Sequence, residues 1–166
     1  MKLNMRRYRN EDDYWRIRNF LRRVLQLNGH RQFSWPVARL DYWRWHLIEN
    51  CQLCDPLESV IFLWETEEGK IAAVLHPEER GGAFLQVDPR WRTPELEEEM
   101  LDVAAQHLAH PKNRKLWVWV HTNDDLRQAI LARRGFTKVL HPNAVEHQHR
   151  RSLDAPVSVV PPTAGY

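Results

Sequence analysis

The 166-residue chain contains few cysteines and few glycines, two and six respectively, and no long apolar run. Two cysteines are too few for a disulfide framework, so we expect reduced thiols and a cytoplasmic location. A transmembrane helix needs a run of about 18 apolar residues, which is absent. The first residues, MKLNMRRYRNEDDY, also lack the apolar core of a signal peptide. These absences predict a protein without a membrane partner.

A strong excess of charge is also absent, because 24 lysines and arginines face 22 acidic residues, for a formal net charge of +2. Proteins that bind nucleic acid usually carry a clear positive excess. Four arginines of the first predicted helix are interleaved with its apolar stripe, which fits a solvated face. These are Arg16, Arg18, Arg22 and Arg23. We predict no nucleic-acid partner.

The composition, with 43% hydrophobic and 28% charged residues, is typical of a soluble domain that buries a sizeable core. Apolar periodicity and turn residues predict the element order β-α-α-β-β-β-α-β-α-β-β. The predicted strands span 1–9, 57–66, 70–76, 82–87, 116–121, 136–140 and 144–153. The predicted helices span 11–27, 36–48, 94–110 and 124–134. We expect one domain over residues 1–153 and a Pro-rich linker or tail over 154–166.

The segment QVDPRWRTPELEEEML, residues 86–101, begins as a strand, passes through a turn and becomes a helix. Thr93 as the N-cap and Pro94 at the first helical position start this helix. The N-terminus of a helix attracts anions, and glycine allows a phosphate to approach the backbone closely. The segment contains no glycine, and four glutamates crowd the first turns of the helix. They are Glu95, Glu97, Glu98 and Glu99.

The element order and two motifs resemble the GNAT (Gcn5-related) N-acetyltransferase superfamily over residues 1–153. The segment FLQVDPRWR, residues 84–92, is similar to the family's V-x-P-x-x-R pattern before the acetyl-CoA loop. The segment DDLRQAILARRGF, residues 124–136, is similar to N-x-x-A-x-x-L-Y-x-x-x-G-F. The resemblance implies a mixed α/β fold with a mostly antiparallel central sheet and about four flanking helices. It also implies a splay between the strands 82–87 and 116–121.

The resemblance further implies acetyl-CoA as co-substrate, with no metal. It assigns four cofactor-binding residues, Leu85, Val87, Arg92 and Thr93. The family's loop, R/Q-x-x-G-x-G/A, falls on residues 92–97, where Glu95 and Glu97 replace the two glycines. Like charges ~4 Å apart repel by about 4 kcal/mol at an effective dielectric constant of 20, which is about a thousandfold in affinity. We therefore predict that coenzyme A binds poorly in the ordinary pose.

The second motif also lacks residues that the family has at these positions. Leu131 replaces the tyrosine that often protonates the leaving thiolate, and Asp124 replaces the asparagine. A leucine cannot donate a proton, so no catalytic residue is assigned. His121, at the end of a predicted strand, is a candidate general base at neutral pH, although a histidine without such a role is the simpler interpretation.

Other patterns that could indicate a binding site have a simpler interpretation. The Cys51-x-x-Cys54 pair lacks the second pair that structural zinc requires, so two loop thiols are expected. His147 and His149 share one face of a predicted strand, which also fits an ordinary polar edge. Trp117 and Trp119 lie in the apolar run 116–121 and are predicted to be core residues. We predict no metal site.

Three functions remain open at this point. The first is the non-catalytic, structural half of a tandem acetyltransferase, because VVPPTAGY, residues 159–166, resembles the start of a further acetyltransferase domain. That domain, in the same full-length protein, would be the partner. The second is an active acetyl-CoA-dependent N-acetyltransferase acting on a small-molecule or protein amine. The third is a non-enzymatic interaction or ligand-sensing module.

Overall fold

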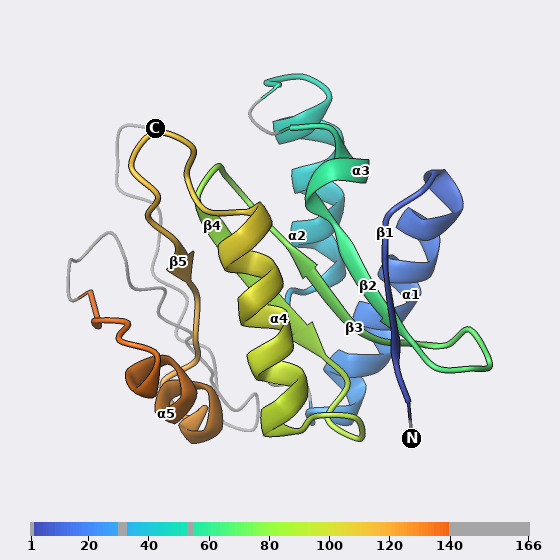
Figure 1. Ribbon diagram of the computed structural model, residues 1–166. Helices are drawn as coiled ribbons and strands as arrows, with labels where there is room; N and C mark the ends of the chain where they lie inside the picture. The colour runs from blue at the N-terminus through green and yellow to red at the C-terminus, as the bar shows by residue number, and fades with distance from the viewer. Residues whose placement is uncertain (1, 30–32, 53–54, 140–166) are drawn as a thin grey trace, which may run out of the picture. The chain divides into compact units, whose positions relative to one another are not determined.

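The computed structural model describes residues 2–29, 33–52 and 55–139 (Figure 1). The chain divides into two compact units, Met1–Phe136 and Thr137–Tyr166. The fold presented below is that of the first unit. The predicted strand 144–153, the tail 154–166, His147, His149 and Cys54 lie outside the described residues.

The core of the first unit is a five-stranded sheet with strand order β1-β2-β3-β4-β5. Its first three pairings are antiparallel and the last, between β4 and β5, is parallel. The mostly antiparallel sheet predicted from the sequence is therefore confirmed. The strands are β1 (Asn4–Arg7), β2 (Phe62–Glu65), β3 (Ile71–His76), β4 (Gly82–Val87) and β5 (Trp117–Val118).

Helices cover both faces of this sheet, with α4 on one face and α1 and α2 on the other (Figure 1). Every residue of β3 and β4 is buried, as expected for strands with helices on both faces. The helices are α1 (Glu11–Leu27), α2 (Val37–Tyr42), the π-helix η1 (Trp43–Ile48), α3 (Leu57–Val60), α4 (Pro94–His107) and α5 (Asp125–Arg133). None of the helices in the described part of the chain is long and apolar enough to cross a membrane.

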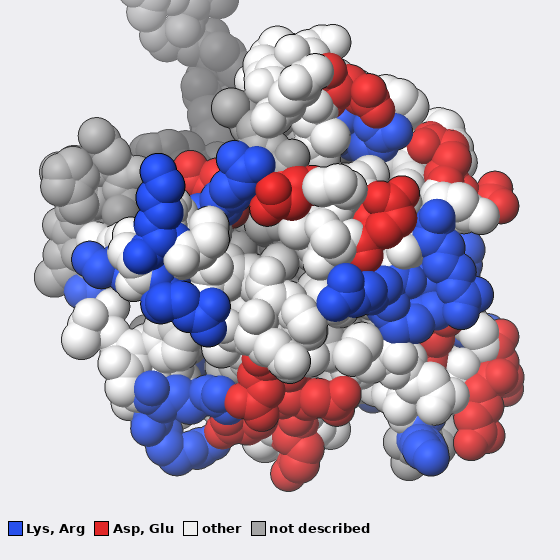
Figure 2. Space-filling view, turned by 45° about the horizontal axis from the view of Figure 1, so that its top comes forward, with Lys and Arg blue, Asp and Glu red and all other residues white. Residues whose placement is uncertain are grey.

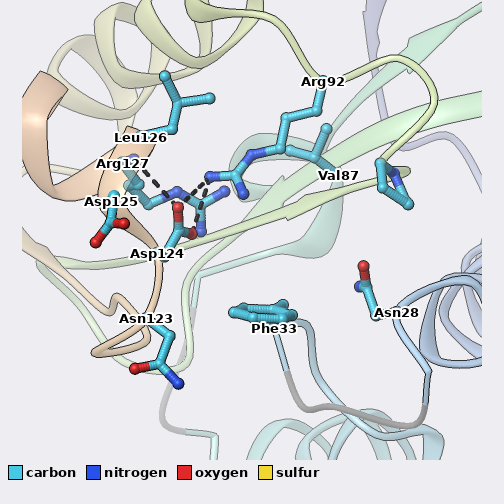
Figure 3. Close-up of a pocket in the computed structure, with 10 residues that line it drawn as sticks. Asn28, Phe33, Val87, Arg92, Asn123, Asp124, Asp125, Leu126 and Arg127 are labelled. Atoms are coloured by element: carbon cyan, nitrogen blue, oxygen red, sulfur yellow. Dashed lines mark hydrogen bonds and ion pairs between the residues drawn. The ribbon is translucent and has the colours of Figure 1, made fainter.

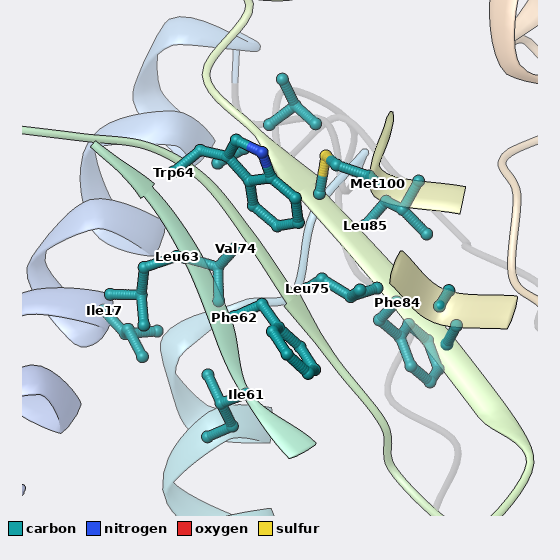
Figure 4. Close-up of a cluster of buried hydrophobic side chains, with 14 of the residues drawn as sticks. Ile17, Ile61, Phe62, Leu63, Trp64, Val74, Leu75, Phe84, Leu85 and Met100 are labelled. Carbon is teal, nitrogen blue, oxygen red and sulfur yellow. The ribbon is translucent and has the colours of Figure 1, made fainter. Parts of the chain in front are cut away.

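The apolar core lies on both sides of the sheet because strand residues alternate between its faces (Figure 4). Leu63 of β2 points toward Ile17 of α1, whereas Trp64 and Leu85 lie on the side of Met100 of α4. All five side chains are at most 2% exposed. Both helical layers are thus held by the same central strands.

The surface carries both signs of charge in close proximity. Figure 2 shows Lys and Arg side chains next to Asp and Glu side chains, around an uncharged area in the middle of this face. Neither sign dominates this face, in keeping with the formal net charge of +2.

The predicted strand 57–66 is wrong in its first part, because Leu57–Val60 forms the short helix α3 and only Phe62–Glu65 is a strand. The Ile61 N–H donates to the Leu57 carbonyl at 3.0 Å, which closes a single helical turn. One turn is too short for periodicity to distinguish it from a strand. The predicted helix 36–48 does form, but from Trp43 onward it is a π-helix.

The predicted strand 116–121 is also shorter than expected, since β5 comprises only Trp117 and Val118. Trp117 is 49% exposed, so its prediction as a core residue is wrong, whereas Trp119 is partly buried and stacks on Phe84. Residues 136–139 form no strand, which contradicts the described part of the predicted strand 136–140. The Phe136 N–H instead donates to the Leu131 carbonyl at 3.0 Å, so this segment begins in the closing turn of α5 rather than as a strand.

Candidate functional site

The strands β4 and β5 diverge, as the sequence predicted. Their pairing covers only the first two residues of β4, and the last hydrogen bond runs from the Trp119 N–H to the Ala83 carbonyl at 3.4 Å. On the other side of β4, the Asp88 N–H donates to the Ala72 carbonyl of the β3 side at 2.9 Å. Because backbone groups alternate in direction along a strand, Leu85 and Val87 direct their N–H groups toward the splay.

A cavity of about 300 Å³ opens where β4 ends (Figure 3). Its walls come from the end of α1, the α1–α2 loop, the β4–α4 loop and the first turn of α5. The lining residues are Asn28, Phe33, Val87, Pro89, Arg92, Asn123, Asp124, Asp125, Leu126 and Arg127. Of the four predicted cofactor-binding residues, Val87 and Arg92 line this cavity, whereas Leu85 and Thr93 do not.

Leu85 and Thr93 have other surroundings. The Leu85 side chain is buried on the α4 side of the sheet (Figure 4). Thr93 caps α4, because its hydroxyl oxygen accepts a hydrogen bond from the Leu96 N–H at 3.2 Å. The sequence prediction of Thr93 as the N-cap is therefore confirmed.

Two backbone N–H groups near the start of α4 have acceptors on Thr93, the residue that caps the helix. The Thr93 hydroxyl binds the Leu96 N–H, and the Thr93 carbonyl accepts from the Glu97 N–H at 3.1 Å. Interactions with its own N–H and with the Thr93 hydroxyl lower the pKa of Glu95. Pro94 has no N–H to offer. An incoming anion would have to displace these internal acceptors.

Arg92 is bound to two carboxylates, one in α4 and one on the residue that caps α5. Its Nε lies 2.6 Å from Oε1 of Glu97 in α4, and its Nη2 lies 2.7 and 2.8 Å from the two oxygens of Asp124. Figure 3 shows the Arg92 guanidinium turned toward Asp124 at the cavity wall. Burial alone would lower the pKa of Arg92, but its attraction to Glu97 and Asp124 outweighs burial and raises the pKa.

A second arginine completes this network. Arg127 of α5 donates to Glu97 through Nε at 2.8 Å and through Nη2 at 2.7 Å. Asp124 also caps α5 by accepting from the Arg127 N–H at 3.1 Å. We call these four residues, Arg92, Glu97, Asp124 and Arg127, the site network. It joins the β4–α4 loop, α4 and α5 with equal numbers of positive and negative groups.

The site network is largely withdrawn from water. The Glu97 side chain is fully buried, the Asp124 and Arg127 side chains are 3% and 5% exposed, and only Arg92 reaches 22%. Buried charges are stable only when they are paired and hydrogen-bonded, so each member requires the others. From the sequence we noted Glu97 as one of four glutamates at a helix start, and its inward direction and its partner Arg127 were both missed.

The other candidate residues show no catalytic arrangement. Leu131, at the position of the family's tyrosine, is buried in the core. His121 packs edge-on against Phe33 with ring centroids 4.7 Å apart, and its Nδ1 accepts from the Asn123 N–H at 3.1 Å. His121 does not line the cavity. Its contact with Phe33, which does line the cavity, places His121 behind the cavity wall.

Metal binding finds no support in the part of the chain that the structure describes, where no group of three or more histidine, cysteine or acidic residues could hold an ion. Cys51 is exposed, and its Sγ lies 3.9 Å from Nε2 of His46. Two donors are fewer than a structural zinc site requires.

The chain matches no family model and no curated protein. Solved structures do resemble it. A GCN5-related N-acetyltransferase from Sphaerobacter thermophilus aligns with a TM-score of 0.58 and 12% identity, over 80% of this chain and 42% of that chain. The ribosomal-protein-S18-alanine N-acetyltransferase from Escherichia coli aligns with a TM-score of 0.56 and 16% identity, over 83% and 79% of the two chains. A GNAT-family acetyltransferase from Staphylococcus aureus Mu50 aligns with a TM-score of 0.57 and 15% identity, over 90% and 96%.

These similarities define the class of fold. The described chain has the mixed α/β fold of GNAT acetyltransferases, with a five-stranded sheet flanked by helices. The chain spans less than half the length of the Sphaerobacter protein.

Proposed function

We propose that this domain is the non-catalytic half of a tandem acetyltransferase, with a coenzyme A loop that has lost its pyrophosphate site. The observation that carries the proposal is the site network. Arg92 occupies the position from which the resemblance expects a pyrophosphate contact, and its guanidinium is bound to Glu97 and Asp124. A pyrophosphate would have to compete with two carboxylates for that arginine.

The start of α4 supports the same proposal. A phosphate binds a helix N-terminus through free N–H groups. Here the Thr93 hydroxyl already accepts from the Leu96 N–H, and the Glu95 carboxylate adds a negative charge at the place of binding. The absence of glycine from residues 86–101 adds the bulk of side chains.

Three further observations favour this proposal. The position of the family's proton-donating tyrosine is Leu131, which is buried among apolar residues. The chain covers 42% of the Sphaerobacter acetyltransferase, so the same fold also occurs as part of a longer protein. The segment 159–166 resembles the start of a second such domain. We propose that this second domain, within the same full-length protein, carries the acetyl-transfer site.

A second candidate, an active N-acetyltransferase, is favoured by the splay between β4 and β5. Leu85 and Val87 still direct N–H groups toward it, and the cavity of about 300 Å³ lies at its mouth. In such an enzyme an amine would attack the thioester carbonyl, polarised by the Val87 N–H, and the carbon–sulfur bond would break. The amine proton would pass to water or a base, and the thiolate would take up a proton. The acceptor would be a small-molecule amine or, as in the name of the Escherichia coli neighbour, a protein amine.

The third candidate is a ligand-sensing module, and the cavity favours it too. The cavity is walled by the amides of Asn28 and Asn123 and by the ring of Phe33. Such a mixture of polar and apolar groups suits a small ligand. The candidate predicts ligand binding without acetyl transfer.

Isothermal titration of the 166-residue chain with acetyl-CoA separates the first proposal from the second. We expect no saturable binding below about 1 mM, because the pyrophosphate would have to displace the carboxylates that are bound to Arg92. We also expect no release of free thiol when amines are added. Micromolar binding by the unaltered chain would overturn the proposal.

A matched pair of variants tests the physical cause. Glu95→Gly combined with Asp124→Asn removes two carboxylates at the site, leaves Glu97 bound to both arginines and keeps a side chain that can cap α5. We expect this variant to gain measurable affinity for acetyl-CoA. The control, Glu67→Gly with Glu68→Gln, removes two exposed carboxylates from the β2–β3 turn and should gain none.

A further inference from the structure

The outer face of α1 carries an exposed stripe with the spacing of a helix–helix contact. The exposed positions are Asp12, Trp15, Asn19, Arg22 and Gln26. They follow one another at intervals of three, four, three and four residues, the repeat by which one helix packs along another. The opposite face of α1 is buried against the sheet. Figure 1 places α1 on the side of the sheet away from α4, so this stripe points outward.

Trp15 stands near the middle of this stripe and is 49% exposed. Its ring packs edge-on against Tyr14 at 5.0 Å between centroids. Trp45, which donates its indole N–H to the Tyr14 hydroxyl at 3.0 Å, and Tyr42 are also exposed and come from the neighbouring η1 and α2. Exposed tryptophan and tyrosine beside arginine are the residues that contribute most to protein–protein interfaces. This face therefore has the composition of a binding surface.

The two charged ends of the stripe carry opposite signs. Asp12 lies in the first turn of α1 and Arg22 lies ten residues further on, which is about 15 Å along a helix. Neither side chain has a hydrogen-bond or ion-pair partner among the described residues, unlike Asp13 and Arg16 on the same helix. Two parallel copies of α1 would place like charges together. Two antiparallel copies would place Asp12 of each against Arg22 of the other.

We propose that the chain forms a two-fold dimer in which the α1 helices of two copies pack antiparallel through this stripe. An antiparallel pairing centred at residue 17 sets Asp12 opposite Arg22 of the second copy. The same register sets Trp15 opposite Asn19 of the second copy, so both indoles leave water. A two-fold contact uses one surface twice, and this stripe is complementary to itself only in the antiparallel direction.

Arg16 and Arg18 lie on either side of the proposed two-fold axis, and the same register sets Arg18 of one copy opposite Arg16 of the other. Arg16 is already paired with Asp13 and Glu65. Arg18 is paired as well, because its Nε lies 3.1 Å from Oδ1 of Asp41. Its guanidinium also lies over the Trp15 ring, 5.7 Å from the ring centroid. The like charges at the axis are therefore no obstacle to association. This proposal does not depend on the proposed function.

Sedimentation equilibrium of the purified chain tests the dimer directly. The monomer mass is 19.9 kDa, and we expect a concentration-dependent shift to twice that mass. Trp15→Ala should raise the dissociation constant about tenfold or more, because a central aromatic residue dominates an interface of this kind. Trp117→Ala is the matched control, since Trp117 is equally exposed, at 49%, but lies in β5. A monomer at all concentrations up to about 100 μM would overturn the proposal.

Charge reversal tests the direction of the pairing. Arg22→Glu alone and Asp12→Lys alone each put like charges opposite one another twice, and each should weaken the dimer about tenfold to a hundredfold. An equimolar mixture of the two variants restores opposite charges at both contacts, so we expect a heterodimer close to wild-type affinity. Circular dichroism should show that both variants remain folded. Failure of the mixture to associate better than either variant alone would also overturn the proposal.

Discussion

Two ion-pair networks of identical composition lie in different parts of this domain. The site network joins two arginines and two carboxylates between the β4–α4 loop, α4 and α5. A second network, which we call the edge network, joins the outermost strand β1 to β2 and α1. It consists of Arg6, Asp13, Arg16 and Glu65.

The edge network remains in contact with water. Arg16 is 38% exposed, and Arg6 and Glu65 are each 15% exposed. Arg6 donates to both oxygens of Asp13 and of Glu65 at 2.7 to 2.8 Å. Burial alone would raise the pKa values of Asp13 and Glu65, but the hydrogen bonds from Arg6 and Arg16 lower both. If one member is lost, water can solvate the remaining arginines.

The comparison shows that burial decides what such a network does. At the edge, four charges support β1, which pairs with β2 alone among the described strands. At the site, four charges of the same kinds are more deeply buried, and under the proposed function they hold the arginine that a pyrophosphate would contact. Under the proposed function the site network matters for ligand binding as well as for stability, because without Arg92 the buried Asp124 carboxylate would lose its ion-pair partner.

The largest expected effect comes from Glu97→Ala. This change leaves Arg92 and Arg127 without a shared, buried carboxylate, and removing one partner of a buried ion pair costs about 3–5 kcal/mol of the free energy of unfolding. Glu65→Ala in the edge network should cost only about 1–2 kcal/mol, because Arg6 and Arg16 can turn to water. Urea unfolding followed by circular dichroism measures both.

The control for this comparison replaces the charges together. Glu97→Leu with Arg127→Leu removes a buried pair rather than orphaning one member, so the double variant should lose clearly less stability than the sum of its single variants. If Glu97→Ala lowered the free energy of unfolding no more than Glu65→Ala, the proposed difference between the two networks would be wrong.

His76 is a buried titratable side chain, and its protonation tests the effect of burial on a single charge. His76 of β3 is 1% exposed, and its Nε2 lies 3.0 Å from the Gln86 amide nitrogen. Burial lowers the pKa of His76 to about 4, assisted by the positive charge of Arg39 and opposed by the contact with the Pro77 carbonyl. The unfolded state therefore binds this proton more readily than the folded state. The stability contribution is complete above the unfolded pKa of about 6.5 and is lost as the pH falls toward 4.

This shift corresponds to about 3 kcal/mol between pH 7 and pH 4. Unfolding free energies measured across this range should show the loss in the wild-type chain. His76→Gln should remove most of the slope between pH 6.5 and 4, whatever its stability at pH 7. An unchanged slope in the variant would mean that other groups cause the acid sensitivity.

The elements that sequence reasoning predicted correctly have strong local causes. The strand 82–87 is continuously apolar around Gln86, and α4 begins at a threonine cap followed by proline. The helix α1 starts after Asn10 with three acidic residues in its first turn. Asn10 makes no side-chain capping bond, so the acidic turn and the buried stripe of α1 are the better explanation.

The parts that failed depend on distant contacts. Glu97 and Arg127 are 30 residues apart, and no local pattern joins them. One signal was available, because Glu97 lies beside Leu96, Met100 and Leu101 on the inward face of α4. A glutamate in an apolar stripe needs a buried cation. The extent of β5 likewise depends on where β4 diverges from it, which residues 116–121 alone do not specify.

The smallest effect is expected for an ion pair that is more exposed than either network. Glu68 and Lys70 form an ion pair of 2.7 Å in the turn between β2 and β3, with side chains that are 73% and 72% exposed. The Lys70 ammonium lowers the pKa of Glu68, yet the surrounding water screens most of the attraction between the two charges. Glu68→Gln should leave the urea midpoint of unfolding unchanged within error, at low and at high salt. A measurable loss would show that ion-pair geometry contributes to stability without burial, and the difference between the two networks would then need another cause.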